Sequence, residues 1–483
     1  MTTLVWFRRD LRLTDNPAVH AALADGGPML AVYVHAPEEE GDWAPGGASR
    51  WWLHHSLAAL AAELERLGSR LCLRAGRDSL ATLLELARAS GARRVLWNRL
   101  YEPSALRRDR HVKAGLRAAG LEAESFNGAL LHEPWTVRNR AAEPFQVFTA
   151  FWRHCRTLPD PPAPTAPPGA LAPPPRFPGS ESLDGLALLP RLGWAAGIAR
   201  SWTPGSGAAQ AALGRFLQEG FADYADARDR PGVIGTSRLS PHLHFGEIGP
   251  RQVWHALRRG ADAGELPRTW RDSQYLAELG WREFAHHLLY HFPHTAEAPL
   301  RPAYARFPWR EDGAGLRAWQ RGLTGYPIVD AGLRELWHTG WMHNRVRMIA
   351  ASFLVKDLLI SWRAGARWFW DTLVDADLAS NTLGWQWVAG CGADAAPYFR
   401  IFNPVSQGDR FDAQGGYVRR WLPELAGLPD AWLMQPWAAA PAVLQAAGVT
   451  LGQTYPQPCV EHAAARQRAL EALASLKAPS ASH

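Results

Sequence analysis

The segment between residues 341 and 387 contains the side chains best suited to chemistry. Tryptophans recur along it, and among them stand Arg345, Arg347, Asp375, Asp377 and Asn381. A core that needed only bulk would use Leu, Ile and Phe, which carry no N–H to satisfy when buried. An indole can also give up one electron and pass the hole to a neighbouring indole. The segment therefore indicates a site for a redox-active or light-absorbing cofactor.

A second candidate is the stretch YLAELGWREFAHHL, residues 275–288. On a helix, Glu278, Trp281 and Arg282 stand at i, i+3 and i+4 and share one face. A carboxylate, an indole and a guanidinium on one face can hold a planar polar ligand. The alternative, an exposed Glu–Arg pair beside a core tryptophan, fits this segment equally well.

A third candidate is GTSRLSPHLHFGEI, residues 235–248, which places the hydroxyls of Thr236, Ser237 and Ser240 beside Gly235. Amides at a helix start together with short hydroxyls can bind a phosphate. A simple N-cap explains the same residues, and this stretch alone favours the N-cap.

Buried polar residues need partners. The polar residues that interrupt DADLASNTLGWQW, residues 375–387, could find them at the edge of a flavin ring, or Asp375 could be a paired structural carboxylate. His343 is either a general acid or base or a satisfied core histidine, and one residue does not decide between these.

The elements that must position these groups differ between the two halves of the chain. Strand-like runs alternate with helical stretches in the first 130 residues: strands over 4–7, 29–34, 70–73 and 94–98, and helices over 51–67 and 79–89. This alternation predicts a parallel sheet covered by helices, a doubly wound α/β domain. FRRDLRLTDN follows the first strand in place of G-x-G-x-x-G, so a classical dinucleotide site is not expected.

We expect three parts: an α/β domain over residues 1–130, a connector over 131–204 and an all-helical domain over 205–475. Proline is dense at 157–178, which excludes helix and central strand there. Fifteen of the 24 tryptophans lie after residue 250, where helical periodicity dominates.

Composition sets outer limits on function. A chain of 483 residues is too long for one ordinary core. Four scattered cysteines predict neither a disulfide framework nor a metal site. No apolar run reaches 18 residues and the N-terminus lacks a signal-peptide pattern, so we expect a cytoplasmic protein without membrane segments. A net charge of +6 permits a nucleic-acid partner without requiring one.

Long motifs along most of the chain resemble those of the photolyase/cryptochrome family. They are FRRDLRLTDN, GTSRLSPHL, WREF, TGYPIVDA, WMHNRVRM, SFLVKDLL, GWQW and DAAPYFRIFNP, in the family's order. The nearest resemblance is to the bacterial class I cyclobutane pyrimidine dimer photolyases. It implies an N-terminal α/β domain and a helical domain that binds FAD. It also implies an enzyme that splits dimers in UV-damaged DNA, single- or double-stranded, by light-driven electron transfer from reduced FAD. We expect a monomer.

Residue by residue, the resemblance implies these cofactor contacts. Positions that bind the FAD phosphates and sugar are Tyr224, Thr236, Ser237, Arg238, Leu239 and Ser240. Positions that line the flavin or its adenine half are Tyr275, Arg282, Arg347, Asp375, Ala376 and Asp377. Asn381 matches the residue that faces the reactive N5 atom of the flavin.

The resemblance also implies an electron path and a lesion pocket. The path that conducts electrons from the surface to the flavin is Trp309, Trp362 and Trp385. The residues that receive the flipped dimer or contact DNA are Glu278, Trp281, Asn344, Arg345, Met348, Trp387, Arg400 and Gln407. Glu278 would hydrogen-bond to the thymine pair.

Two questions stay open at this level. Members that use folate as an antenna carry an Asn–Glu pair in the turn that here reads YEPSALRRD, where Ser104 and Ala105 stand instead. This disfavours folate and leaves a deazaflavin, another flavin or no antenna. The alternative function is a blue-light cryptochrome photoreceptor. Because Asn381 is neither Asp nor Cys, and because the lesion-pocket residues are present, the sequence favours repair.

Overall fold

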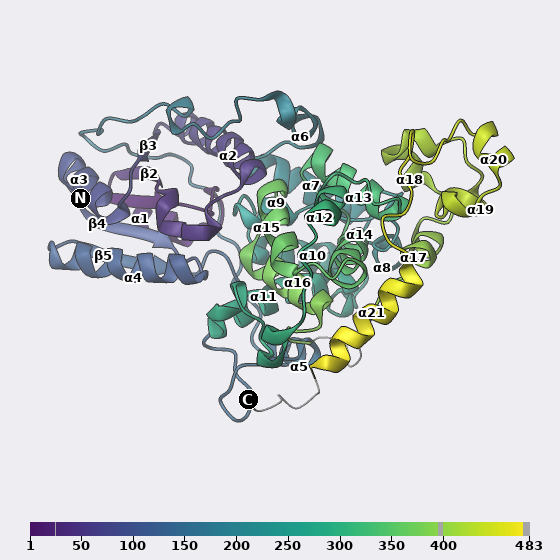
Figure 1. The fold of residues 1–483 in the computed structure, drawn as a ribbon. Helices are drawn as coiled ribbons and strands as arrows, with labels where there is room; N and C mark the ends of the chain where they lie inside the picture. Colours follow the sequence, from purple (N-terminus) through teal and green to yellow (C-terminus); the bar gives the residue numbers. More distant parts are fainter. Residues whose placement is uncertain (25, 395–398, 477–483) are drawn as a thin grey trace.

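A parallel sheet organises the N-terminal part of the protein (Figure 1). The computed structural model describes residues 1–24, 26–394 and 399–476. Its strands are β1 (Thr2–Phe7), β2 (Met29–His35), β3 (Leu71–Ala75), β4 (Ala92–Asn98) and β5 (Glu122–Phe126). All neighbouring strands are parallel, in the order β3-β2-β1-β4-β5.

Both faces of this sheet are buried, as the doubly wound prediction requires. Leu4 and Trp6 of β1 belong to one core cluster, whereas Val5 and Phe7 belong to another. Successive side chains of a strand point to opposite faces, so each face needs its own cover of helices. The α/β prediction is confirmed. Strand β5 was missed because it lies at the sheet edge and carries the polar residues Glu122, Glu124 and Ser125.

Two pairs of helices cover the two faces. The helical segments of this domain are α1 (Pro17–Leu23), η1 (Pro37–Trp43), α2 (Gly47–Arg66), α3 (Ser79–Ser90) and α4 (Pro103–Ala118). Helices α1 and α2 share a cluster with Val5, and α3 and α4 share one with Leu4. The carboxyl ends of β1 and β2 face the helical part of the molecule, because side chains there line a cavity together with Trp370.

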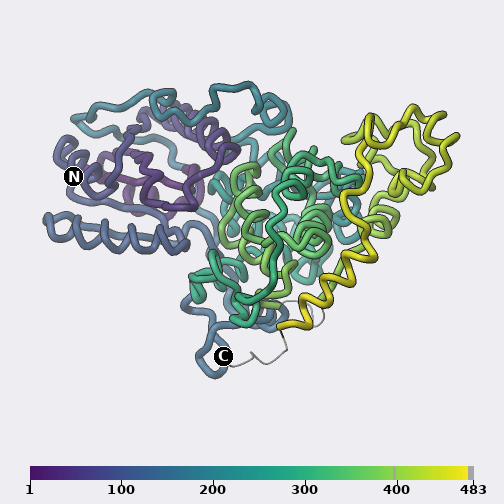
Figure 2. Tube along the Cα trace, in the orientation of Figure 1, coloured from purple at the N-terminus to yellow at the C-terminus, as the bar shows by residue number. Residues whose placement is uncertain are grey.

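The connector folds back over the α/β domain (Figures 1 and 2). Its helical pieces are α5 (Phe148–Cys155), η2 (Asp184–Leu186), η3 (Gly193–Ala195) and α6 (Ala196–Ser201). The Leu171 amide donates to the carbonyl of Leu67 (2.9 Å), and the Met29 amide donates to that of Ala172 (2.9 Å). The proline-rich stretch is therefore a surface-hugging connection. Its predicted limits at 131 and 204 remain a prediction.

The rest of the described chain is helical, which confirms the second half of the fold prediction. The early segments are α7 (Ser206–Glu219), α8 (Tyr224–Ala227), α9 (Ser240–His244), α10 (Pro250–Asp262), η4 (Trp270–Asp272), α11 (Gln274–His291), η5 (Pro293–Ala296) and η6 (Pro302–Arg306). The central ones are α12 (Gly313–Gln320), α13 (Pro327–Thr339), α14 (Asn344–Ser352), the π-helical η7 (Phe353–Asp357), α15 (Trp362–Thr372) and α16 (Leu378–Ala389).

The final segments are α17 (Pro404–Phe411), α18 (Gly416–Trp421), η8 (Pro423–Leu425), α19 (Asp430–Leu433), η9 (Pro436–Ala438), α20 (Pro441–Ala446) and α21 (His462–Ser475). Helices α18 to α20 form a projecting lobe, and α21 runs along the side of the helical domain (Figure 1). The largest core cluster is built mainly from α13, α14, α15 and α16. Within the described residues, no helix is both long and apolar enough to span a membrane.

Candidate functional site

Helices α14, α15 and α16 and the turn before α16 enclose a cavity of about 180 Å³. Residues that the sequence assigned to separate roles line it together: Asn344, Arg347, Met348, Asp375, Ala376, Asp377, Asn381 and Trp385. Positions expected to hold the flavin and positions expected to receive the lesion therefore open into one space. Side chains do not fill it.

A buried ion pair stands in the wall of this cavity. Arg347 donates from one terminal nitrogen to both carboxylate oxygens of Asp375 (3.0 and 2.8 Å), and its Nε donates to the Met342 carbonyl (2.7 Å). The Asp375 side chain is only 2% exposed. A buried charge is tolerated when it is paired and hydrogen-bonded, so this pair can present fixed polarity to a ligand without an uncompensated charge.

Asn381 also lines the cavity, and its orientation is fixed. Its side-chain amide donates to the carbonyl of Ala366 (3.0 Å). Asn381 lies in the first turn of α16, which Asp377 caps by accepting from the Ser380 amide (2.8 Å). An amide held in this way can form hydrogen bonds but has no carboxylic proton to give.

Trp385 lines one side of the cavity. A Cβ on Gly365 would lie 2.1 Å from the Trp385 ring, so this indole packs directly on the backbone of α15. Trp362 stands one turn earlier on the same helix. Trp385 and Trp362 are 2% and 3% exposed, whereas Trp309 is only partly buried against the same core cluster. Burial thus decreases from Trp385, which lines the cavity, to Trp309, and the electron path through the three indoles remains a prediction.

A second cavity, of about 280 Å³, lies beside the GTSRLS motif, and Thr236, Ser237 and Arg238 line it. Helix α9 begins at Ser240, but its N-cap residue is Leu239 and makes no side-chain capping bond. The simple N-cap interpretation is therefore wrong. Short hydroxyls at an open cavity instead suit a polar ligand.

Arg238 adds positive charge to that second cavity. Its guanidinium lies over the rings of Trp202 (4.2 Å) and Trp341 (4.8 Å), and its Nε is buried without a hydrogen-bond partner among the described residues. Its φ of 52° is unusual for a residue other than glycine. An unsatisfied cationic donor beside two hydroxyls fits a diphosphate. Together the two cavities fit FAD: one suits its phosphates, and the other suits a polar heterocycle beside an indole.

Other residues expected at the cofactor form packing behind these cavities. The rings of Tyr224 and Tyr275 are 5.2 Å apart, and Tyr275 also packs on Phe216 (4.4 Å). Leu239 is buried in the same cluster, whereas Ser240 is exposed. Their direct contact with a cofactor remains a prediction.

The three residues expected to share one face of α11 have separate partners. Glu278 is ion-paired with Arg228, and Trp281 stacks on Phe148 with ring centroids 3.7 Å apart. Arg282 donates to the carbonyl of Ala129 (2.7 Å) and lines a small cavity with Asp377, apart from the two larger ones. The structure therefore does not bring these three side chains together at one ligand site, because the neighbours of each side chain come from different segments.

Two adjacent ion pairs join α11 to α14. Arg228 pairs with Glu278, and its neighbour Asp229 accepts from Arg345 (2.7 Å). The sequence interpretation missed Arg228 and Asp229. The charged run DARDR directly after Tyr224 was the available signal.

The remaining positions expected to contact DNA lie near the surface. Trp387 borders the main core cluster, Gln407 lies on α17, and the exposed Arg400 stands over the ring of Phe402 (5.0 Å). Four positions of the DAAPYFRIFNP motif, residues 395–398, lie outside the described residues. Nothing in the structure tests a contact between DNA and Trp387, Arg400 or Gln407, so their roles remain predictions.

His343 has a structural position. It caps α14 by accepting from the Arg345 amide at Nδ1 (3.2 Å), and its own amide donates to Glu335 (3.2 Å). Burial lowers the pKa of His343 to about 4, so it is neutral at pH 7. The capping contact explains its presence without acid–base chemistry.

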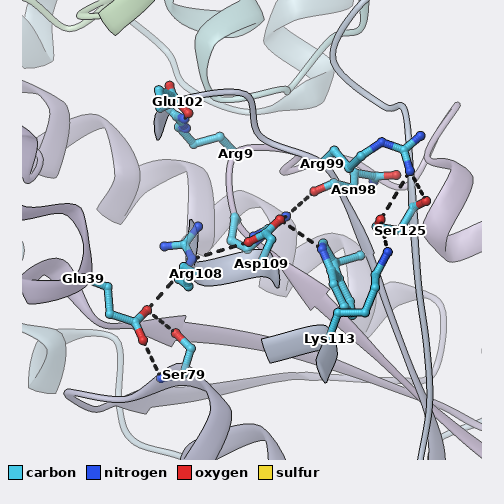
Figure 3. A network of polar contacts seen from close by, with 12 residues as sticks. Arg9, Glu39, Ser79, Asn98, Arg99, Glu102, Arg108, Asp109, Lys113 and Ser125 are labelled. Atoms are coloured by element: carbon cyan, nitrogen blue, oxygen red, sulfur yellow. Dashed lines mark hydrogen bonds and ion pairs between the residues drawn. The ribbon is translucent and has the colours of Figure 1, made fainter. Parts of the chain in front are cut away.

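The sequence did not foresee a third cavity, of about 50 Å³, between the α/β and helical domains. Arg8, Arg9 and Arg108 line it together with Trp370. Figure 3 shows the charged network around Arg108. Its side chain is 8% exposed, and Nε and Nη2 have no hydrogen-bond partner in the described part of the chain. Unsatisfied guanidinium donors facing a cavity can bind a ligand that carries acceptor groups.

Comparisons with known proteins agree with this geometry. Residues 3–168 match the family model "DNA photolyase", and residues 275–475 match "FAD binding domain of DNA photolyase". The chain is 48% identical to a deoxyribodipyrimidine photo-lyase of Agrobacterium fabrum, over 98% of both proteins. It is also 43% identical to cryptochrome-1 of Arabidopsis thaliana, over 98% of this chain and 70% of that protein.

Among solved structures, a bacterial class III photolyase from Agrobacterium tumefaciens superposes with a TM-score of 0.95 at 48% identity, covering 99% of this chain and 98% of that one. We expected the nearest resemblance to be to class I photolyases, and this class III relative corrects that expectation. The helical part of the chain is an FAD-binding domain, and the protein is a member of the photolyase/cryptochrome family.

Proposed function

We propose that the protein repairs DNA by splitting cyclobutane pyrimidine dimers with light, using reduced FAD in the helical domain. The observation that carries this proposal is the shared cavity. Asn344 and Met348, expected on the lesion side, line the same space as Arg347 and Asn381, expected on the flavin side. Electron transfer requires donor and acceptor to be close, and a common cavity provides that closeness.

When bound, FAD would supply the light-excited electron that opens the dimer and then takes it back. The residues of this chain provide the surroundings for that exchange. Arg347 and Asp375 hold a fixed dipole in the cavity wall, and Asn381 presents an oriented amide without an acidic proton. Charged groups that are already oriented cost no reorganisation when charge moves.

A dimer inside a duplex must leave the helix to reach this cavity. Flipping costs a few kcal/mol and least for a damaged pair. Stacking on aromatic side chains returns about 1–3 kcal/mol per base, a role for which we propose Trp281 and Trp387. Arg345 and Arg400 would contact phosphates, so we expect binding that weakens with salt and reads little sequence.

The alternative is a photoreceptor. It deserves a direct test, because a plant cryptochrome is as similar to this chain as many photolyases are: the photo-lyase of Escherichia coli is 41% identical, against 43% for cryptochrome-1. Two features of the chain favour repair. Asn381 is not an acid, and Asn344 and Met348 line an open space that could receive a flipped pyrimidine dimer.

Repair of UV-irradiated oligothymidine by purified protein with fully reduced FAD, in light and in darkness, decides between these functions. Loss of dimers only in light is expected. Binding of FAD without light-dependent loss of dimers would indicate the photoreceptor. The monomeric state and cytoplasmic location remain predictions.

We also propose that the cavity between the domains takes a second chromophore with acceptor groups. The unsatisfied Nε and Nη2 of Arg108 carry this proposal. An archaeal photolyase from Sulfolobus tokodaii, solved with two FAD molecules, superposes with a TM-score of 0.80 at 26% identity over 98% of this chain and all of that one. Arg108→Met should remove near-ultraviolet or blue absorbance beyond that of FAD while FAD content stays constant. An unchanged spectrum would oppose the assignment.

A further inference from the structure

His286 on α11 is placed between two hydrogen-bond acceptors. Its Nδ1 faces the carbonyl oxygen of Arg282 (3.0 Å), and its Nε2 faces a carboxylate oxygen of Asp377 (3.5 Å). A neutral imidazole has one N–H donor, whereas the cation has two. Only the cation can donate toward both acceptors.

The same carboxylate oxygen of Asp377 faces a second buried histidine. His244 Nδ1 lies 3.6 Å away, and it has no hydrogen-bond partner among the described residues. Both histidines are less than 10% exposed. Although burial acts to raise it, the nearby imidazoles of His286 and His244 hold the pKa of Asp377 well below its ordinary range. Burial lowers the pKa of His244. One carboxylate oxygen therefore faces two buried imidazoles.

Charged groups from every packed segment are otherwise paired. After β1, Arg9 is ion-paired with Glu102 at the start of α4, as Figure 3 shows. On α11 itself Arg282 lies near Glu283 (3.8 Å), which accepts from the amides of Leu131 and His132. The edge of the Tyr101 ring meets the His286 ring at 6.5 Å. Arg9 and Arg282 line the same small cavity, but each has a carboxylate of its own, so we assign the balance of Asp377 to His286.

These groups surround a small cavity of about 20 Å³ lined by Arg9, Glu102, His244, His286 and Asp377, among others. A cavity of this size with several polar partners can hold a water molecule. Asp377 also lines the 180 Å³ cavity. It therefore connects His286 to the expected flavin site.

We propose that His286 is a positioning residue whose cation neutralises and orients Asp377 at the floor of the flavin cavity, and so makes reduction of bound FAD more favourable. The inference rests on the proposed location of the flavin. An unbalanced carboxylate would oppose the addition of an electron nearby, because like charges repel strongly where water is excluded.

The protonation state is tested directly by ¹⁵N NMR of histidine-labelled protein at pH 7, with FAD bound and after its removal. We expect both ring nitrogens of His286 to carry protons. His287, the next residue, is an internal contrast: its Nε2 accepts from the Phe145 amide (3.1 Å), and burial lowers its pKa to about 3. A neutral His286 ring would overturn the proposal.

The electrostatic role is tested by three variants at one position. His286→Arg keeps a cation, His286→Gln keeps a donor without charge, and His286→Leu keeps neither. At a fixed reference-dye potential, the ratio of reduced to oxidised FAD should fall about tenfold in the Gln and Leu variants, as one charge at partly screened distance predicts. The Arg variant should stay near wild type. A purely structural role would instead be rescued by Gln.

A double-mutant cycle separates the effect of charge balance at Asp377 from the effect of packing at His286. In His286→Leu/Asp377→Asn the uncompensated carboxylate is gone, so the ratio should return toward the wild-type value. A double variant that stays as low as His286→Leu would contradict the charge-balance account.

Failure of the proposed function is distinguishable from failure of this inference. Protein that binds FAD but shows no light-dependent repair would reject the function and leave the NMR and potential measurements interpretable. A neutral His286, or equal ratios in all three variants of an active enzyme, would reject the inference alone.

Discussion

The cavity between the domains and the cavity inside the helical domain differ in how the arginines that line them are paired. In the helical domain Arg347 has Asp375 within 2.8 Å and a backbone carbonyl within 2.7 Å. In the cavity between the domains, the carboxylates nearest to Arg108 stand 3.5 Å or more away, and two of its nitrogens have no hydrogen bond in the described structure. One site is electrostatically complete before a ligand arrives. The other has donors without hydrogen bonds, which we propose a ligand completes.

The difference has a physical meaning for function. A group that must change its own charge, as FAD does, is best held by surroundings that are already balanced, because they need no rearrangement. A group that only absorbs light can be recruited by unsatisfied donors, since its charge stays constant. We therefore expect substitutions in the helical cavity to affect stability and electron flow, and substitutions of Arg108 to affect occupancy.

The largest effect is expected in the proposed electron path that begins at the helical cavity. Trp362→Phe should abolish photoreduction while repair by chemically reduced enzyme stays nearly intact, because phenylalanine keeps the packing but is much harder to oxidise than indole. Light-driven bleaching of oxidised FAD measures this. Trp368→Phe on the same helix is the matched control, since Trp368 stacks on the exposed Trp337 (6.0 Å). Equal photoreduction in wild type and Trp362→Phe would break the path assignment.

Removal of one member of the balanced pair should be costly. Asp375→Leu leaves Arg347 as an uncompensated, largely buried charge, for which we expect a loss of about 3–5 kcal/mol in the free energy of unfolding and poor FAD retention. Urea unfolding and flavin absorbance per protein measure both. Asp430→Ala is the control, because Asp430 is 61% exposed in its pair with Arg419 and should cost less than about 1 kcal/mol. Similar losses in both variants would break the comparison.

Acid should weaken the helical domain through His343. Its folded pKa of about 4 lies below the usual unfolded value of about 6.5, so the unfolded state binds more protons between them. Stability from this group is present at pH 7 and is lost as the pH falls from about 6.5 toward 4. Between pH 7 and 5 we expect His343→Asn, which can still cap α14, to lose about 2 kcal/mol less than wild type. Parallel pH dependence of both proteins in urea unfolding would contradict this.

Glu278 tests the proposed contacts with the lesion. We propose that Glu278 forms a charge-assisted hydrogen bond to the flipped dimer, so Glu278→Gln should lower the quantum yield or rate of repair about tenfold. FAD content should not change, because Glu278 does not line either large cavity. A loss of FAD together with activity would place Glu278 in cofactor binding instead.

A smaller effect on stability is expected at Arg108. Arg108→Met removes two donors that lack hydrogen bonds and three long ion pairs of 3.5–3.9 Å, so without a second chromophore we expect a loss of about 1 kcal/mol in the free energy of unfolding, below that of Asp375→Leu. The loss in the free energy of unfolding measured for Asp375→Leu is the reference for this change. A loss at Arg108 as large as that at Asp375 would show that the guanidinium is needed for folding rather than for ligand capture.

Local residue patterns allowed much of the fold to be predicted. Alternation of short apolar runs with helical stretches predicted the doubly wound sheet, and four strands were located within one or two residues. Strand β5 escaped because Glu122 and Glu124 give an edge strand little apolar signal. The motif positions also predicted that Asn381 and Arg347 belong to a cofactor site, since long motifs record contacts that a single residue does not.

The sequence by itself determined the family, the flavin domain and the residue types at the site, because these depend on local pattern and on motif identity. Tertiary structure alone decided which side chains meet. It placed Asn344 and Asn381 in one cavity, separated Glu278, Trp281 and Arg282, and set His286 between two acceptors. Such contacts join α11, α14 and α16, which are far apart in the chain. They depend on how whole elements pack, and no local periodicity encodes that packing.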